Sequence, residues 1–242
     1  MSVVPGLLFA VTKPFDPNLT EHEFNDWYNN KHIVDVVNCG LAANGFRYRN
    51  ADPSASWPYL AIYRLPDLKK LYDPVFMVNV PTDSPKSWGK GYMPDVAKAE
   101  LRGYELVRVF EPTERSRNKD GYAKVLVNAE IESDESPEEF VATFAKDHLG
   151  SINGQDGYRR SMLYKSAEAF VPRESKSADD ERAGTEFHAA QQQRLTYLAV
   201  YEFDQAPADV AAVVMGKNVG VWNYITEYGT GLYRIEPTPG RR

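Results

Sequence analysis

Residues 20–32 read TEHEFNDWYNNKH, and residues 136–148 read SPEEFVATFAKDH. Each segment begins with a hydroxyl residue, has a glutamate three positions later followed by an aromatic residue, and ends in histidine. A hydroxyl residue and a glutamate at this spacing form a capping box, which marks the start of a helix. The two segments therefore predict two equivalent helices with a histidine at the same place in each, and they indicate an internal duplication.

Three more pairs of short segments occur in the same order in both halves of the chain. They are Gly45-Phe46-Arg47 with Gly157-Tyr158-Arg159, Tyr59-Leu60-Ala61-Ile62-Tyr63 with Tyr197-Leu198-Ala199-Val200-Tyr201, and Glu111-Pro112-Thr113 with Glu236-Pro237-Thr238. A repeat of this length corresponds to a whole domain rather than to a solenoid unit. We expect a first unit over residues 1–113, a linker over 114–121 and a second unit over 122–242.

The composition is that of a globular protein. Of the 242 residues, 43% are hydrophobic, the net charge is −6, and the single cysteine, Cys39, excludes an internal disulfide. The chain has no basic stripe, which argues against a nucleic-acid partner. No segment approaches the roughly 20 apolar residues of a membrane helix, and the N-terminus lacks the basic region of a signal peptide. We expect a soluble cytoplasmic protein.

Apolar runs and turn signals predict the same order of elements in both units. The expected strands are Gly6–Thr12, Phe46–Arg49, Tyr59–Arg64 and Tyr104–Phe110 in the first unit, and Lys124–Ile131, Tyr158–Lys165, Thr196–Phe203 and Leu232–Ile235 in the second. One helix runs from Thr20 to about Asn38 and stops at Gly40, another follows Ser136, and a short one covers Pro207–Met215. This is the ferredoxin-like βαββαβ arrangement of an α+β protein.

The two units differ in their insertions. Residues 166–193 are rich in Ser, Glu, Asp and Gln, which predicts a solvated excursion. Residues 71–98 instead contain Phe76, Met77, Trp88 and Tyr92. A long connection with large apolar side chains is expected to pack over a cavity as a lid.

Phe24, Tyr28 and His32 lie four residues apart, so on an α-helix they form one stripe that should face the sheet. A histidine in such a stripe can be an ordinary core residue with one satisfied hydrogen bond. It can also titrate near neutrality and transfer a proton. Asp35 follows three residues later and could orient the ring or hold its charge, while Tyr28 offers a hydroxyl group to the same space.

The second histidine has different neighbours. His148 has Phe144 and Ser151 where His32 has Tyr28 and Asp35. The first unit is therefore better equipped for chemistry. The sequence shows no metal-ligand spacing, no phosphate-binding glycine loop and no nucleophilic serine elbow, so we expect no metal site and no nucleotide cofactor.

Residues 24–35, FNDWYNNKHIVD, and the following Gly45-Phe46-Arg47-Tyr48 resemble the EthD-like members of the dimeric α/β-barrel superfamily, in the long duplicated form common in filamentous fungi. The second half departs from the pattern, since Thr143 and Phe144 replace the aromatic pair. The resemblance implies two ferredoxin-like repeats that form a pseudo-dimeric barrel of two four-stranded sheets within one chain, with helices outside. Relatives of this fold include cofactor-free cyclases, decarboxylases and isomerases, as well as haem enzymes.

From the residues and the resemblance we predict a cofactor-independent lyase or isomerase of secondary metabolism that binds a small aromatic or polyketide-like substrate and is a monomer or homodimer. His32 would transfer a proton, Tyr28 would stabilise developing charge and Asp35 would orient the ring. The expected substrate-contacting residues are Phe24, Trp27, Tyr48, Tyr63, Phe76, Trp88, Tyr92 and His148. Two alternatives are a haem protein with His148 as the axial ligand and a non-catalytic binding or structural protein.

Overall fold

The computed structural model describes residues 3–77, 79–80, 83–88, 91–111, 122–147, 149–152, 154–167 and 195–229. Several predicted features lie outside these residues. They are the 114–121 linker, His148, most of the 166–193 excursion and the expected strand Leu232–Ile235.

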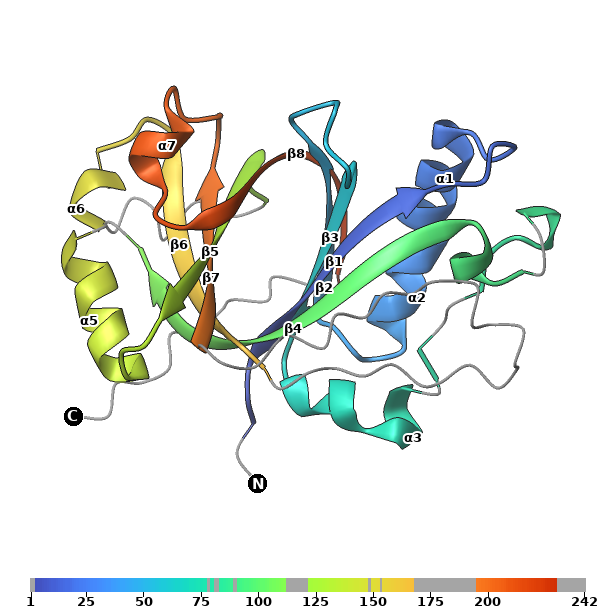
Figure 1. The fold of residues 1–242 in the computed structure, drawn as a ribbon. Coiled ribbons are helices and arrows are strands. Elements are labelled where there is room, and N and C mark those ends of the chain that lie inside the picture. Colours follow the sequence, from blue (N-terminus) through green and yellow to red (C-terminus); the bar gives the residue numbers. More distant parts are fainter. Residues whose placement is uncertain are drawn as a thin grey trace.

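Eight antiparallel strands close into a barrel in the order β1-β3-β2-β8-β5-β7-β6-β4 (Figure 1). The strands are β1 Gly6–Pro14, β2 Asn44–Asn50, β3 Tyr59–Leu65, β4 Ala97–Phe110, β5 Val125–Ser133, β6 Tyr158–Ser166, β7 Leu195–Phe203 and β8 Lys217–Gly229. Each half of the chain contributes four neighbouring strands, and the two sets join where β2 pairs with β8 and β4 with β6. The α+β barrel expected from the resemblance is confirmed.

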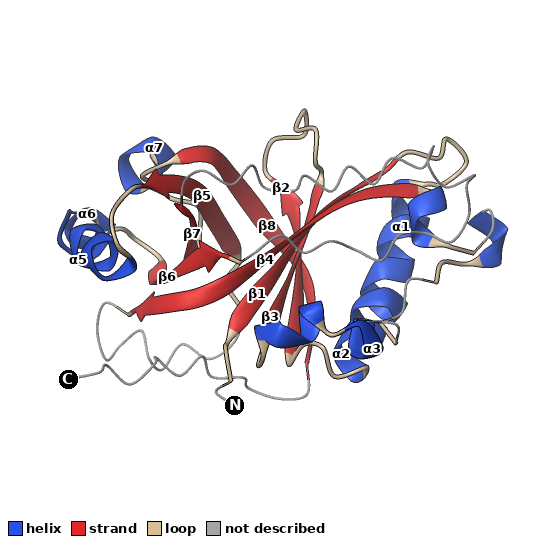
Figure 2. Ribbon diagram, turned by 60° about the horizontal axis from the view of Figure 1, so that its bottom comes forward, coloured by secondary structure: helices blue, strands red, loops and turns tan. Residues whose placement is uncertain are grey.

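Helices cover the outside of the barrel on two opposite sides (Figures 1 and 2). On the first-half sheet lie α1 Glu21–Trp27, the π-helical turn η1 Tyr28–His32 and α2 Ile33–Asn38, followed in the chain by the short helices η2 Leu68–Tyr72, α3 Pro74–Met77, η3 Lys86–Trp88 and η4 Met93–Asp95. On the second-half sheet lie α5 Pro137–Asp147, α6 Leu149–Ile152 and α7 Val210–Val213. None of the helices in the described ranges is both long enough and apolar enough to cross a membrane.

The two long helical segments begin with the same capping box, as predicted. The hydroxyl of Thr20 accepts a hydrogen bond from the backbone N–H of Glu23 at 3.2 Å, and the carboxylate of Glu23 accepts one from the N–H of Thr20 at 3.0 Å. Ser136 and Glu139 make the equivalent pair of bonds at 3.4 and 3.2 Å. Both helix starts therefore follow directly from their local sequence.

Three apolar cores result from the alternation of side chains along the strands. One core fills the barrel, and the other two lie between each sheet and its helices. On β2, Phe46 and Tyr48 belong to the core inside the barrel, whereas Arg47 between them contacts aromatic rings of the first-half helical layer. Near one end of the barrel interior, Glu202 forms ion pairs at 2.7 Å with both Arg64 and Arg160.

The structure corrects three predictions of element bounds. Strand β4 begins at Ala97, seven residues before the predicted Tyr104, and α7 is shorter than the predicted Pro207–Met215 helix. The strand that closes the barrel is β8, Lys217–Gly229, which the prediction missed. The start of β8 is irregular: Gly216 and Asn218 have positive φ angles and the pairing with β5 shifts in register, so simple alternation does not reveal the strand.

One of the predicted sequence correspondences is wrong. Gly45 lies inside β2, opposite Tyr63, whereas Gly157 lies before β6 with a φ of +77°. The pairing of β2 with β3, and of β6 with β7, shows which residues occupy equivalent positions in the two halves. Arg47 pairs with Ala61, and Leu163 pairs with the matching Ala199, so Leu163 occupies the place of Arg47. The burial of alternate side chains, rather than a three-residue similarity, sets the strand register.

Candidate functional site

A group of polar and aromatic side chains lies between the first-half helical layer and the outer face of its sheet. Its centre is formed by Tyr28, His32 and Arg47, whose exposed fractions are 2%, 9% and 0%. The charged or titratable groups among them are thus shielded from water by the protein itself. We call this group the first-layer site.

The spacing of Tyr28 and His32 predicts a regular α-helix, but the structure has a π-helical turn at these residues. In η1 the backbone N–H of Ile33 donates to the carbonyl of Tyr28, five residues earlier. Such a π-turn adds one residue to the turn and is frequent at functional sites. His32 and the adjacent Ile33 are both buried around this turn. Ile33 packs closely on Gly45, where an added Cβ would lie 2.6 Å from its Cγ1.

The His32 ring is held by aromatic contacts. It stacks on Trp27 with 5.0 Å between ring centroids and meets Tyr28 edge to face at 4.7 Å. Among the described residues, no side chain or backbone group makes a hydrogen bond to the ring. Burial and the nearby positive charge of Arg47 lower the pKa of His32 to about 4. The imidazole is therefore neutral at physiological pH, and burial and Arg47 both disfavour its protonated form.

Arg47 is a buried cation that the sequence analysis did not select. Its Nη1 donates to the amide oxygens of Asn25 at 2.9 Å and Asn29 at 2.7 Å. The guanidinium carbon lies 4.0 Å from the ring centroid of Tyr28 and 5.0 Å from that of Tyr59. Nε and Nη2 are buried, and neither has a hydrogen-bond partner in the described part of the chain.

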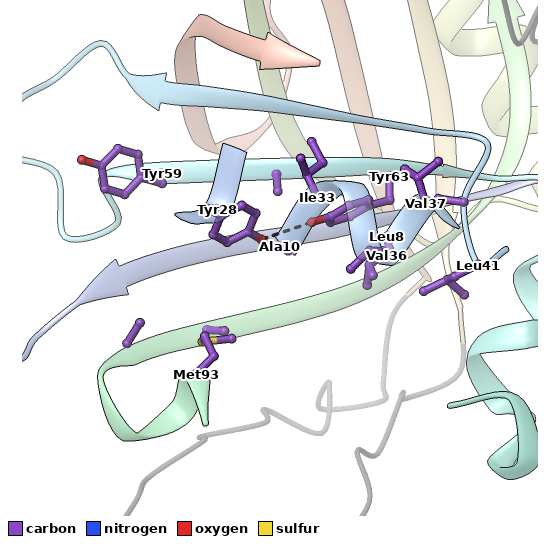
Figure 3. Close-up of a cluster of buried hydrophobic side chains, with 14 of the residues drawn as sticks. Leu8, Ala10, Tyr28, Ile33, Val36, Val37, Leu41, Tyr59, Tyr63 and Met93 are labelled. Atoms are coloured by element: carbon purple, nitrogen blue, oxygen red, sulfur yellow. Dashed lines mark hydrogen bonds between the residues drawn. The ribbon is translucent and has the colours of Figure 1, made fainter. Parts of the chain in front are cut away.

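Tyr28 and Tyr63 bring two hydroxyl groups to the same layer (Figure 3). The hydroxyl of Tyr63 donates to that of Tyr28 at 3.4 Å. Burial raises the pKa of both tyrosines, so both stay protonated at neutral pH. Because Tyr28 is the acceptor in this bond, its own hydrogen remains available for an oxygen atom of a ligand.

Asp35 does not take the place predicted for it. Its carboxylate forms an ion pair with Lys31 at 2.5 Å on the outer side of the helix, and it makes no hydrogen bond to His32. The Asp35 charge acts on the ring only at a distance, where it raises the pKa of His32 against the larger effects of burial and Arg47. The prediction that Asp35 orients the ring directly is corrected on this geometry.

The predicted substrate-contacting residues divide into two groups. Phe24, Trp27, Tyr63 and Trp88 gather around the first-layer site, with 5.5 Å between the ring centroids of the two tryptophans. Tyr48 does not, because it faces the barrel interior, where it meets Tyr224. Tyr92 is 42% exposed. Phe76 belongs to α3, but its side chain, like His148, lies outside the described residues.

The second-half layer has the same framework without the polar centre. Leu163 stands in the place of Arg47 and is fully buried. Counting from the shared capping box, Val141 and Ala145 replace Asn25 and Asn29, and Phe144 replaces Tyr28. Within the described residues no group of three or more His, Cys, Asp and Glu side chains could hold a metal ion.

Comparison with known proteins places the chain among fungal relatives. No family model matches it. The core atranone cluster (CAC) protein 1 of Stachybotrys chlorohalonatus is 48% identical over 240 residues, which cover 99% of this chain and 98% of that protein. The chain belongs to the family of core atranone cluster protein 1.

Two solved structures are similar to this chain along nearly its whole length. A crystal structure of an anthrone oxidase-like protein superposes with a TM-score of 0.50 at 12% identity and covers 95% of this chain and 94% of that one. A candidate monooxygenase of Fusobacterium nucleatum has a TM-score of 0.49 at 11% identity, over 96% and 97% of the two chains. The anthrone oxidase-like protein therefore shares the fold of this chain, which is an eight-stranded antiparallel barrel.

Proposed function

We propose that the protein is a small-molecule enzyme that transfers protons at the first-layer site without a cofactor, as a lyase or isomerase. The observation that carries this proposal is His32. Its ring is buried and neutral, has no hydrogen-bond partner among the described residues, and lies beside a fixed positive charge. A core histidine with only a structural role would instead use a ring nitrogen in a hydrogen bond.

In the proposed reaction, a ring nitrogen of His32 takes a proton from a substrate carbon next to a carbonyl group. The electrons of the broken C–H bond move to the carbonyl oxygen, and the resulting enolate accepts a hydrogen bond from Tyr28. His32 then returns the proton to another atom of the substrate. Alternatively, the enolate expels a leaving group from the β-carbon, or its carbon attacks a second carbonyl group of the substrate and closes a ring; in each case the departing group or the new alkoxide oxygen takes the proton from His32. Proton transfer of this kind contributes roughly 10²–10⁴-fold in rate.

The low pKa of His32 restricts the substrate. A base whose conjugate acid has a pKa of about 4 removes protons effectively only from acidic carbons. Carbons between two carbonyl groups, or between a carbonyl and an aromatic ring, meet this requirement. Trp27, Tyr28 and Trp88 offer flat apolar surfaces beside the base. These features support an aromatic or polyketide-like substrate.

The pathway assignment comes from the relative. Because the 48% identical protein is named for a core atranone cluster, we propose that this chain also acts in secondary metabolism. We further propose that its two halves, residues 1–113 and 122–242 with a linker over 114–121, arose by duplication of an EthD-like unit. The matching capping boxes and the matching Ala61 and Ala199 registers support this origin.

The test is hydrogen–deuterium exchange at carbon. The purified protein is incubated in D₂O with aromatic ketones that contain an acidic CH₂ group, beginning with 2-tetralone, and deuterium incorporation is followed by NMR. We expect the protein to accelerate exchange and His32→Ala to lose roughly 10²–10⁴-fold of that acceleration. His22→Ala, in the exposed first turn of the same helix, is the matched control and should retain it.

Full activity of His32→Ala would overturn the proposal. Oxygen uptake in step with loss of the ketone would show an oxidase rather than a lyase or isomerase. A Soret band in the purified protein would favour the alternative of a haem enzyme.

A further inference from the structure

We propose that Arg47 is the anion-binding residue of the first-layer site and that the substrate carries a carboxylate group, held by the Nε and Nη2 edge of the guanidinium. The inference names the substrate class of the proposed enzyme and so rests on the same site. This inference concerns carboxylate binding by Arg47, whereas the proposed function concerns proton transfer by His32. Either proposal can fail while the other holds.

Arg47 differs in its partners from three other arginines of the described chain that are buried or partly buried. Arg64 and Arg160 share the carboxylate of Glu202, and Arg159 lies 3.5 Å from the carboxylate of Asp204. Arg47, which is fully buried, has only neutral amide oxygens and aromatic rings around it. Removing a guanidinium from water is costly unless an opposite charge accompanies it. A ligand carboxylate would supply this missing charge.

The unpartnered atoms of Arg47 have the geometry that a carboxylate requires. Nη1 is occupied by Asn25 and Asn29, whereas Nε and Nη2 have no partner among the described residues. The hydrogens of Nε and Nη2 project side by side from one edge of the guanidinium plane. A carboxylate accepts both of them in a bidentate pair. The two asparagines and the Tyr28 ring fix the plane, so this edge is held in advance of binding.

The fold itself does not require an arginine at this position. In the second-half layer Leu163 takes the same place and is buried in an apolar core, beside a helix that lacks both asparagines. Arg47, Asn25 and Asn29 therefore occur together as a unit in one half and are absent together from the other. A unit that the fold can omit, and that leaves donors unpaired, fits a ligand-binding role.

The surroundings describe the rest of the ligand. Trp27, Tyr28 and Trp88 present aromatic rings near the guanidinium and His32. The indole N–H of Trp27 is a further buried donor without a partner in the described chain. A flat aromatic carboxylic acid with an additional oxygen atom would match these rings and donors.

Binding of two probes tests the proposal. Quenching of tryptophan fluorescence, to which Trp27 and Trp88 contribute, is titrated at pH 7.5 with 1-naphthoate and with 1-naphthalenemethanol, which share the ring system but differ in charge. We expect the wild type to prefer the carboxylate by about 10- to 100-fold, the range for hydrogen bonds to a charged group. Arg47→Leu should lose this preference.

Two variants control the measurement. Arg49→Leu removes an exposed positive charge from the same strand and should leave the preference unchanged. Arg47→Lys keeps the charge but not the bidentate edge, so it should retain only part of the preference, and it decides the matter if Arg47→Leu does not fold. Equal affinity of the wild type for both probes, no binding of either at millimolar concentration, or an unchanged preference in the folded Arg47 variants would overturn the proposal.

Discussion

In the first half of the chain, the layer between helix and sheet holds a buried arginine, two asparagines and a tyrosine. In the second half, the same positions hold leucine, valine, alanine and phenylalanine. The framework around them is shared, because both helices start from the same capping box and both sheets carry the same central alanine in register. The difference distinguishes the residues that the fold requires from the residues that it only accommodates. Apolar packing is sufficient in the second half, so the shared framework does not require the polar group of the first half.

The largest expected effect comes from moving the arginine to the apolar half. Leu163→Arg would bury a guanidinium without the two asparagine oxygens that accompany Arg47. We expect the free energy of unfolding to fall by about 3–5 kcal/mol, as measured by urea denaturation. The reverse change, Arg47→Leu, should alter it by less than about 1 kcal/mol because a hydrophobic residue replaces a costly charge. Similar losses in both variants would contradict the asymmetry.

The pH dependence of stability gives the second effect. In the unfolded chain His32 titrates near 6.5, whereas in the folded protein its pKa is about 4. Between these values the unfolded state binds a proton and the folded state does not, so stability falls as the pH decreases from 6.5 to 4. We expect His32 to account for roughly 3 kcal/mol of this loss.

Comparison with His32→Leu isolates that contribution. Urea denaturation of both proteins at several pH values should show the steeper decline in the wild type. Equal slopes would mean that His32 has the same pKa in the folded and unfolded states, which would contradict the burial of a neutral ring.

The smallest expected change in stability concerns the helix caps, which are alike in the two halves. Thr20→Ala and Ser136→Ala each remove one capping hydroxyl from equivalent helix starts. Each should lower the unfolding free energy by about 1 kcal/mol, and the two values should agree closely. A large difference between them would show that the helices depend on their caps to different extents, and the shared framework would be less equivalent than its geometry suggests.

Much of the fold could be predicted from sequence because local chemistry determines it. Capping residues mark both helices, and the Tyr-Leu-Ala segments mark the central strands. The closing strand β8 was missed because Gly216, just before it, and Asn218, near its start, have positive φ angles that interrupt the alternation. These signals are local, and they work where the structure is regular.

The site was harder to predict because it depends on register between distant segments. Helical spacing predicts that Phe24, Tyr28 and His32 share one stripe, and their rings do pack together in the structure. The prediction selected Tyr48, whereas the adjacent Arg47 is the residue that faces the helix. Neighbouring residues of a strand point to opposite faces, and only the pairing of the strands shows which face is which. The apolar Phe46 and Tyr48 that flank Arg47 were the available signal. Asp35 was selected because it lies three residues from His32. Lys31 lies four residues from Asp35 on the same helical segment, and Asp35 forms its ion pair with Lys31 instead.

We propose that proton transfer takes place at His32, in the first half of the chain. The most direct test compares His32→Ala with His148→Ala, which removes the matching histidine of the second half, in the carbon-exchange assay. The account predicts that His32→Ala loses the acceleration of deuterium incorporation and that His148→Ala keeps it. Loss in His148→Ala with retention in His32→Ala would contradict the account.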